Sequence, residues 1–137
     1  MASPKPESQF INRVHKHLPT VYKEKMNNPY RSGTADVWYS GRDGDLWVEY
    51  KYMKELPKRK TEIALPLTPR QRKWLNDRAD EGRNVAVVLG TANGAAILTG
   101  GSWEYPFPTT ALLCSVEYIA HCIRRYTGDS PCLLPKG

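Results

Sequence analysis

The chain has 137 residues, which suits a single domain spanning residues 1–137 around one hydrophobic core. Its composition, 40% hydrophobic and 25% charged, is that of a globular protein, and it contains neither a bilayer-length apolar run nor an N-terminal signal-type segment. We therefore expect a cytoplasmic protein without a membrane partner, whose net charge of +6 favours a polyanionic ligand such as nucleic acid.

The cysteines indicate reduced thiols. There are three of them, Cys114, Cys122 and Cys132, an odd number without any C-x-x-C pair. A zinc site needs close Cys or His pairs, so we expect no zinc site here.

The first expected element is a helix over residues 6–18, with Glu7 in its first turn and Ser3 or Ser8 as a possible cap. Its apolar residues recur at helical spacing: Phe10, Ile11, Val14 and Leu18. A short strand is expected over residues 20–25.

Two strands rich in Trp, Tyr and Val follow, over residues 35–40 and 45–52. The sequence GRDG joins them, so the pair should form an antiparallel hairpin.

The hairpin carries charged residues at alternating positions. Strand periodicity places Glu49 and Lys51 on one face. If GRDG is a four-residue loop, Asp36 lies opposite Glu49; if Asp43-Gly44 is a two-residue turn, Asp36 lies opposite Lys51. Both registers put the three charges on one face, whereas a three-residue loop would reverse the side of Asp36.

The second half begins with a basic, proline-containing loop over residues 53–67. Thr68 then has the position of a helix N-cap, Pro69 fits the first helical position, and Gln71 completes a capping box. Gly82 is placed to end this helix.

The continuous apolar run of residues 84–90 predicts a strand buried on both faces, and residues 94–100 predict another. We expect Thr110 to cap a last helix. The apolar stripe expected for it consists of Leu112, Val116, Ile119 and Ile123. The element order predicts an α/β fold with a mixed sheet flanked by helices.

The charged residues of the hairpin have a chemical use. Carboxylates directly opposite each other have Cβ atoms about 5 Å apart and repel, and a divalent cation relieves this repulsion. A neighbouring lysine stabilises an anionic nucleophile or leaving group. Asp36, Glu49 and Lys51 together are suited to metal-assisted attack on a phosphodiester. A lone E-x-K is common on solvated strands, so the inference depends on the aromatic hairpin and the basic segments around it.

Taken together, these segments resemble the PD-(D/E)xK nuclease superfamily, and more narrowly its VRR-NUC branch. The matching elements are Glu7 in PESQF, GTAD at residues 33–36, EYK at residues 49–51, and TPRQRKWLNDRADEG followed by NVAVVLG. They cover residues 6–90. No proline precedes Asp36, and the C-terminal extension, residues 101–137, has no assignable motif.

The resemblance implies a restriction-endonuclease-like core with the order αβββαβ, an extra strand and a C-terminal helix. It also implies that Asp36, Glu49 and the main-chain carbonyl of Tyr50 bind Mg²⁺ or Mn²⁺. Lys51 would orient or help deprotonate the attacking water, Glu7 would complete or support the metal shell, and Gln71 would reach toward the site.

Simpler interpretations exist for several of these residues. Glu7 is also a favourable anion at a helix N-terminus, and the capping box alone explains Gln71. Trp38 and Trp47 could stack on a base, but packing under the sheet is the favoured interpretation. The expected DNA contacts, otherwise a solvated basic face, are Lys54, Lys58, Arg59, Lys60, Arg70, Arg72 and Lys73.

The favoured function is a Mg²⁺-dependent DNA endonuclease, and a homodimeric Holliday-junction resolvase is the more specific hypothesis. The first alternative is a non-catalytic nucleic-acid-binding module of the same fold. The second is a restriction or repair endonuclease that reads a sequence or a lesion, for which the chain offers no separate recognition domain.

Overall fold

The computed structural model describes residues 5–26, 33–56 and 61–128. Within these ranges the helices are α1 (Pro6–His15), α2 (Pro69–Asp80) and α3 (Val116–Thr127), with short 3₁₀ helices η1 (Ser102–Glu104) and η2 (Thr109–Ala111). The strands are β1 (Tyr22–Lys25), β2 (Val37–Gly41), β3 (Gly44–Met53), β4 (Glu62–Ile63), β5 (Val85–Thr91), β6 (Gly94–Thr99) and β7 (Phe107–Pro108). The predicted α/β class is confirmed.

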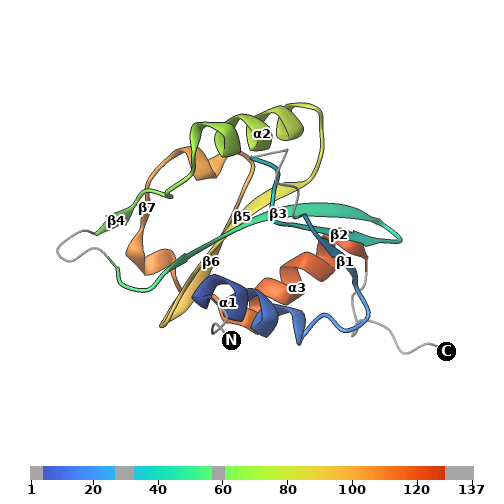
Figure 1. Cartoon of the computed structure of the whole chain (residues 1–137), viewed down its shortest axis with the longest axis horizontal. Coiled ribbons are helices and arrows are strands. Elements are labelled where there is room, and N and C mark those ends of the chain that lie inside the picture. The colour runs from blue at the N-terminus through green and yellow to red at the C-terminus, as the bar shows by residue number, and fades with distance from the viewer. Residues whose placement is uncertain (1–4, 27–32, 57–60, 129–137) are drawn as a thin grey trace.

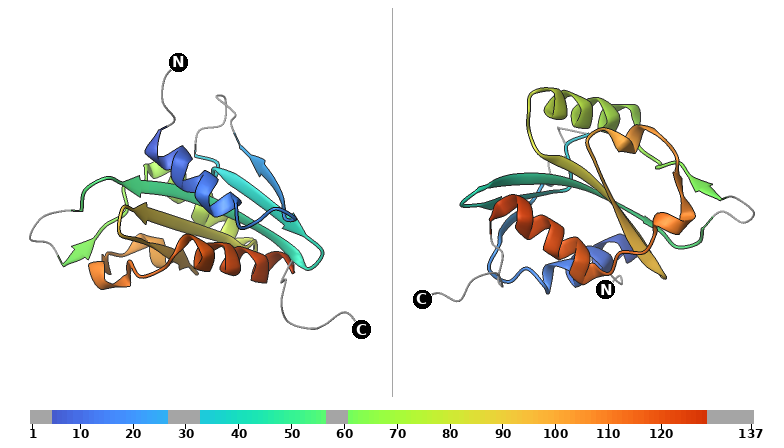
Figure 2. Two further views of the ribbon diagram at one scale, coloured as in Figure 1. Left: turned by 90° about the horizontal axis from the view of Figure 1, so that it is seen from below. Right: turned by 180° about the vertical axis from the view of Figure 1, so that it is seen from behind.

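The main sheet is mixed and has the strand order β1-β2-β3-β5-β6. Among these five strands the β3–β5 pair is parallel, and the other neighbouring pairs are antiparallel. Helix α2 lies over one face of this sheet, whereas α1 and α3 lie on the other (Figures 1 and 2). A small second sheet pairs β4 with β7.

Each face of the sheet has its own hydrophobic core. The core under α1 and α3 contains the alternate β3 residues Leu46, Val48 and Tyr50. The core under α2 contains Leu75 and the fully buried Trp103. All residues of β5 are buried, as predicted for a central strand covered on both faces.

The hairpin has the register expected for a four-residue GRDG loop, but Gly41 and Gly44 belong to the strands, so the loop itself has two residues. Ser40 pairs with Asp45 and Val37 with Val48, so continuing the register places Asp36 across from Glu49. The alternative with an Asp43-Gly44 turn is wrong, because Gly41 and Gly44 pair directly and only two residues separate them.

Helix α2 begins as predicted. The Thr68 hydroxyl accepts from the Gln71 N–H at 3.1 Å, and the Gln71 side-chain oxygen accepts from the Thr68 N–H at 2.9 Å. The helix ends at Asp80, and Gly82 follows with φ +85°.

The two outer helices differ from the prediction at their ends. Helix α1 ends at His15, and Ser8 lies inside it; Lys5 is the N-cap, without a side-chain bond. Helix α3 is capped by Ser115, whose hydroxyl accepts from the Tyr118 N–H at 3.0 Å.

Thr110 is therefore not the cap of the last helix, and it lies in η2 instead. Leu112 does not join the α3 stripe, because it packs in the core under α2. The chain between η2 and α3 is held by paired backbone hydrogen bonds between Ala95 and Cys114 before α3 begins.

Cys114 and Cys122 are free thiols, as expected; Cys132 lies outside the described residues. Within residues 5–26, 33–56 and 61–128, no helix combines the length and the apolarity that crossing a bilayer requires.

Candidate active site

The candidate site lies just before the start of β2, beside the part of β3 that no longer pairs with β2. The β2–β3 ladder extends to Val37 and Val48, and from there to Met53 β3 pairs with β5 alone. Asp36 comes directly before β2, and its carboxylate accepts the Tyr50 N–H at 2.8 Å. The side chain thus satisfies a backbone donor of β3 and is fixed beside Glu49.

Gly33 connects this segment to α2. It has φ +98°, and a Cβ atom at this position would lie 2.8 Å from the carbonyl oxygen of Arg70. A side chain is therefore excluded both by the backbone conformation and by the close approach. The GTAD segment consequently packs against the first turn of α2, which brings Asp36 and Gln71 to one place.

Glu49 is the centre of the arrangement. It is 2% exposed, and its Oε2 lies 3.2 Å from the donating Nε2 of Gln71 and 3.5 Å from Nζ of Lys51. Its Oε1 is buried and has no hydrogen-bond partner among the described residues. Burial, and then the charge of Asp36, raise the pKa of Glu49 to about 8, although Lys51 opposes the shift.

The other two carboxyl groups are perturbed in the same direction. Burial raises the pKa of Asp36, opposed first by the hydrogen bond from the Tyr50 backbone. Burial, and then the charge of Asp36, raise the pKa of Glu7, and the charge of Lys51 opposes this shift. Helix α1 packs on the opposite face of the sheet, and its first turn brings Glu7 near these charges.

The structure thus brings together four of the predicted residues, Asp36, Glu49, Lys51 and Gln71, and places Glu7 within electrostatic reach. In the described part of the chain, no three His, Cys, Asp or Glu side chains are grouped as a metal site. Two carboxylates with a buried oxygen that no described residue satisfies nevertheless fit a divalent cation, which prefers such oxygen ligands.

The predicted DNA contacts fall into three groups. Lys54 is exposed just beyond β3, and Arg70 is exposed in the first turn of α2. Arg72 pairs with Glu104 at 3.5 Å, and Lys73 pairs with Asp77 at 2.9 Å. The predicted contacts Lys58, Arg59 and Lys60 lie outside the described residues.

A row of aromatic rings continues from the site across the sheet. Tyr22 meets Trp38 edge to face at 5.8 Å, Trp38 stacks on Trp47 at 5.8 Å, and Trp47 meets Trp74 at 5.4 Å. The guanidinium of Arg78 lies 5.6 Å from the Trp74 ring centre. We call Tyr22, Trp38, Trp47 and Trp74 the aromatic row.

A chain of hydroxyl groups, which the sequence analysis missed, lies under the site on the other face. His15 Nε2 is 2.8 Å from the Tyr39 hydroxyl, which is 2.5 Å from the Tyr50 hydroxyl. Burial, and then Lys23 and Lys25, lower the pKa of His15 to about 4, so the ring is neutral. The available signal was strand parity, since Tyr39 and Tyr50 both face away from Trp38 and Glu49.

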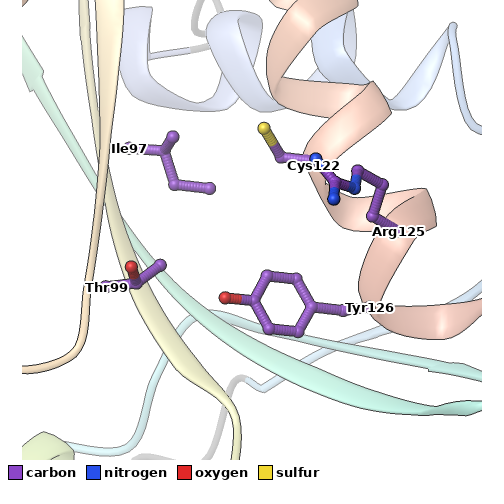
Figure 3. A pocket seen from close by; sticks show the side chains of 5 residues that line it. All are labelled: Ile97, Thr99, Cys122, Arg125 and Tyr126. Atoms are coloured by element: carbon purple, nitrogen blue, oxygen red, sulfur yellow. The ribbon is translucent and has the colours of Figure 1, made fainter.

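A separate cavity of about 420 Å³ lies between β6 and α3. Its lining side chains point toward one another in Figure 3: Ile97, Thr99, Cys122, Arg125 and Tyr126. None of these described lining residues carries a carboxylate, the ligand type that a hydrolytic metal site needs.

No family model matches the chain, and no curated protein was found to be similar. Among solved structures, the chain is similar to Hjc of Archaeoglobus fulgidus, described as a Holliday junction resolvase from an archaeal hyperthermophile. The TM-score is 0.56 at 12% sequence identity, and the match covers 85% of this chain and 97% of Hjc. The likeness shows the fold: the chain has the restriction-endonuclease-like α/β fold of this resolvase, as predicted.

Proposed function

We propose that the chain is a divalent-metal-dependent DNA endonuclease of the PD-(D/E)xK type. One observation carries the proposal. Asp36 and Glu49 meet beside Lys51 and Gln71 at the point where β2 and β3 separate, and one Glu49 oxygen there is buried without a partner among the described residues. Burying such an oxygen is unfavourable unless a ligand compensates it.

Asp36, Glu49, the Tyr50 carbonyl and, as a supporting ligand, Glu7 would hold Mg²⁺ or Mn²⁺. When bound, the ion would supply Lewis-acid stabilisation of the charge that develops on the phosphate. The Tyr50 N–H keeps the Asp36 carboxylate in place, and Gln71 holds that of Glu49.

Lys51 acts on the reacting water. Its side chain is 17% exposed, and its ammonium group lies 3.5 Å from Glu49, so it can face both the carboxylates and an incoming phosphate. The water oxygen forms a bond to phosphorus as the bond from phosphorus to the leaving oxygen breaks. The proton that the water loses passes to the solvent, and the leaving oxygen takes up a proton from the solvent, while Lys51 orients the water and stabilises negative charge.

The more specific proposal is cleavage of branched DNA inside the cell, within the VRR-NUC branch. The structural neighbour is described as a Holliday junction resolvase, and the shared fold supports testing such a junction first. A homodimer would present two such sites with the twofold symmetry of a four-way junction. The net charge of +6 suits a DNA substrate.

The test is incubation with end-labelled single-stranded, duplex, flap and four-way-junction DNA. We expect cleavage with Mg²⁺ or Mn²⁺, none with chelator, and none by Lys51→Ala, which should still bind DNA. Lys16→Ala, at the exposed end of α1, is the matched control and should cleave normally. Metal-independent binding without cleavage of any substrate would instead indicate the non-catalytic module.

A further inference from the structure

We propose that the aromatic row and the pocket at its side bind an unpaired nucleobase of the DNA substrate. This inference rests on the proposed function and narrows its substrate to DNA with a base outside the stack near the cleaved phosphate. The row was defined above as Tyr22, Trp38, Trp47 and Trp74.

The row is continuous with the candidate active site. Trp38 pairs with Trp47 across the hairpin, and the next pair of that face along the strands is Asp36 with Glu49. Two residues of a strand span about 6.6 Å. This distance corresponds to about two nucleotides of a stacked DNA strand, so a strand held at the carboxylates also reaches the row.

The row runs from the core under α2 to the part of the sheet beyond this helix. Trp74 lies in α2 and Trp47 packs against the same core, whereas Trp38 and Tyr22 lie in β2 and β1. Helix α2 packs over β5, while β1 and β2 extend beyond it (Figure 1). Tyr22, at the outer end, is 57% exposed, and Trp38, Trp47 and Trp74 are all partly exposed. Trp38 is held in place because its indole N–H donates to Asp45 at 3.0 Å. Fixed, partly exposed rings are suited to stacking on bases, because every base has a π-face.

A pocket of about 330 Å³ adjoins Trp47. Besides Trp47, the described residues that line it carry carboxylate and guanidinium groups: Asp45, Glu81, Arg78 and Arg83. Arg78 is already oriented by Glu81 at 2.9 Å and by the ring of Trp74. An aromatic wall with both donors and acceptors is what the edge of an unpaired base requires.

Paired bases in a duplex are stacked and turn only their edges to the grooves, so the rings cannot stack on them without distortion. A bulge or a single-stranded flap provides such a base at low cost. The row is therefore expected to discriminate between substrates, whereas the carboxylates act on any phosphodiester.

The experiment measures the affinity of Lys51→Ala protein, which does not cleave, for three DNAs by fluorescence anisotropy. The first is a plain duplex, the second the same duplex with one bulged nucleotide, and the third has an abasic bulge. We expect the DNA with the bulged nucleotide to bind more tightly than both the plain duplex and the DNA with the abasic bulge. We expect this preference to be on the order of tenfold. Adding Trp38→Leu should abolish it without changing the affinity for the plain duplex. Trp38→Phe should restore most of it.

Tyr22→Leu, at a position 57% exposed, gives a second variant that does not disturb the core. Tyr118→Leu removes a ring that is 50% exposed on α3, on the opposite face, and is the matched control. Equal binding of base-containing and abasic bulges, or a preference unchanged in Trp38→Leu and Tyr22→Leu, would overturn the inference. Cleavage assays separate the two proposals: if wild-type protein cleaves no DNA with any metal, the proposed function fails whatever the row binds.

Discussion

At the scale of single residues, Glu49 is the buried carboxyl group at the centre of the candidate site. A carboxyl group that is 2% exposed, beside a second carboxyl group, has a large desolvation cost when it is ionised. Lys51 and Gln71 offset part of that cost at one oxygen, and no described residue does so at the other. Burial therefore favours the protonated form of Glu49 at a pH where an exposed glutamate is ionised.

Glu49 should make the stability of the metal-free protein depend on pH. Its pKa is raised from 4.5 to about 8, so between these values the folded state binds a proton that the unfolded state has lost. Stability should fall as the pH rises through this window. Glu49→Gln should remove this slope and be more stable than wild type at high pH, by on the order of a few kcal/mol. Thermal unfolding with chelator at a series of pH values measures the stability of wild type and of Glu49→Gln. If the two proteins show the same dependence of stability on pH, Glu49 is not the group with the raised pKa.

Asp36 should matter for metal affinity more than for the fold. In Asp36→Asn the amide oxygen can still accept the Tyr50 N–H, so the local structure is kept while the charge is lost. We expect Mn²⁺ affinity in calorimetry to fall by at least the ~10-fold typical of losing an outer partner. Asp77→Asn, on the surface of α2, is the control and should bind normally. Unchanged affinity in Asp36→Asn would remove Asp36 from the metal site.

At the scale of elements, the start of α2 combines a structural and a chemical role in one side chain. The oxygen of the Gln71 amide completes the capping box with Thr68, while its nitrogen donates to Glu49. The capping box could be predicted from the sequence because it is local. The second bond could not, because it depends on how α2 lies against β3.

Two variants separate these roles. Thr68→Ala removes a cap and should cost about 1 kcal/mol of unfolding free energy, with cleavage close to that of wild type. Gln71→Ala removes the cap partner and also the donor to Glu49, so it should lose stability to a similar extent and cleavage much more. Denaturant unfolding and cleavage rates measure the two effects. If both variants cleave equally well, Gln71 serves only the helix.

At the scale of the whole molecule, positive charge is concentrated in the middle of the sequence. Residues 51–60 and 69–74 contain eight of the twenty Lys and Arg residues, and both stretches begin close to the carboxylates. Such clustering is expected to attract a polyanion toward one side of the protein.

Changing Lys58, Arg59 and Lys60 to Ser should flatten the salt dependence of DNA affinity, by about 0.9 in the log–log slope for each phosphate that the protein no longer neutralises. The matched control changes Arg13, Lys16 and Arg125, three exposed cations in or beside α1 and in α3, on the opposite face of the sheet. Affinity titrations at several salt concentrations give both slopes. Equal slopes for the triple variant and the wild type would place the 58–60 segment away from the DNA.

The sequence sufficed for those features that depend on neighbours along the chain. Strand parity predicted the shared face of Asp36, Glu49 and Lys51, and the T-P-x-Q pattern predicted the start of α2. The two-residue strands β4 and β7 were missed because they are held by a pairing between distant parts of the chain, Glu62 with Pro108. Strand parity separates Tyr39 and Tyr50 from Trp38 and Trp47. The hydrogen bond between the two tyrosines and the contacts of Tyr22 and Trp74 with the row depend on packing between elements, which no local pattern encodes.

The contact of Gly33 with the Arg70 backbone bears on the entropic cost of binding an ion. It joins the loop that carries Asp36 to the helix that carries Gln71, so neither can swing aside without opening this contact. The proposed ligands are thus held by packing, so little ordering entropy would be lost if an ion bound there. Uptake should then be rapid and leave the backbone nearly unmoved.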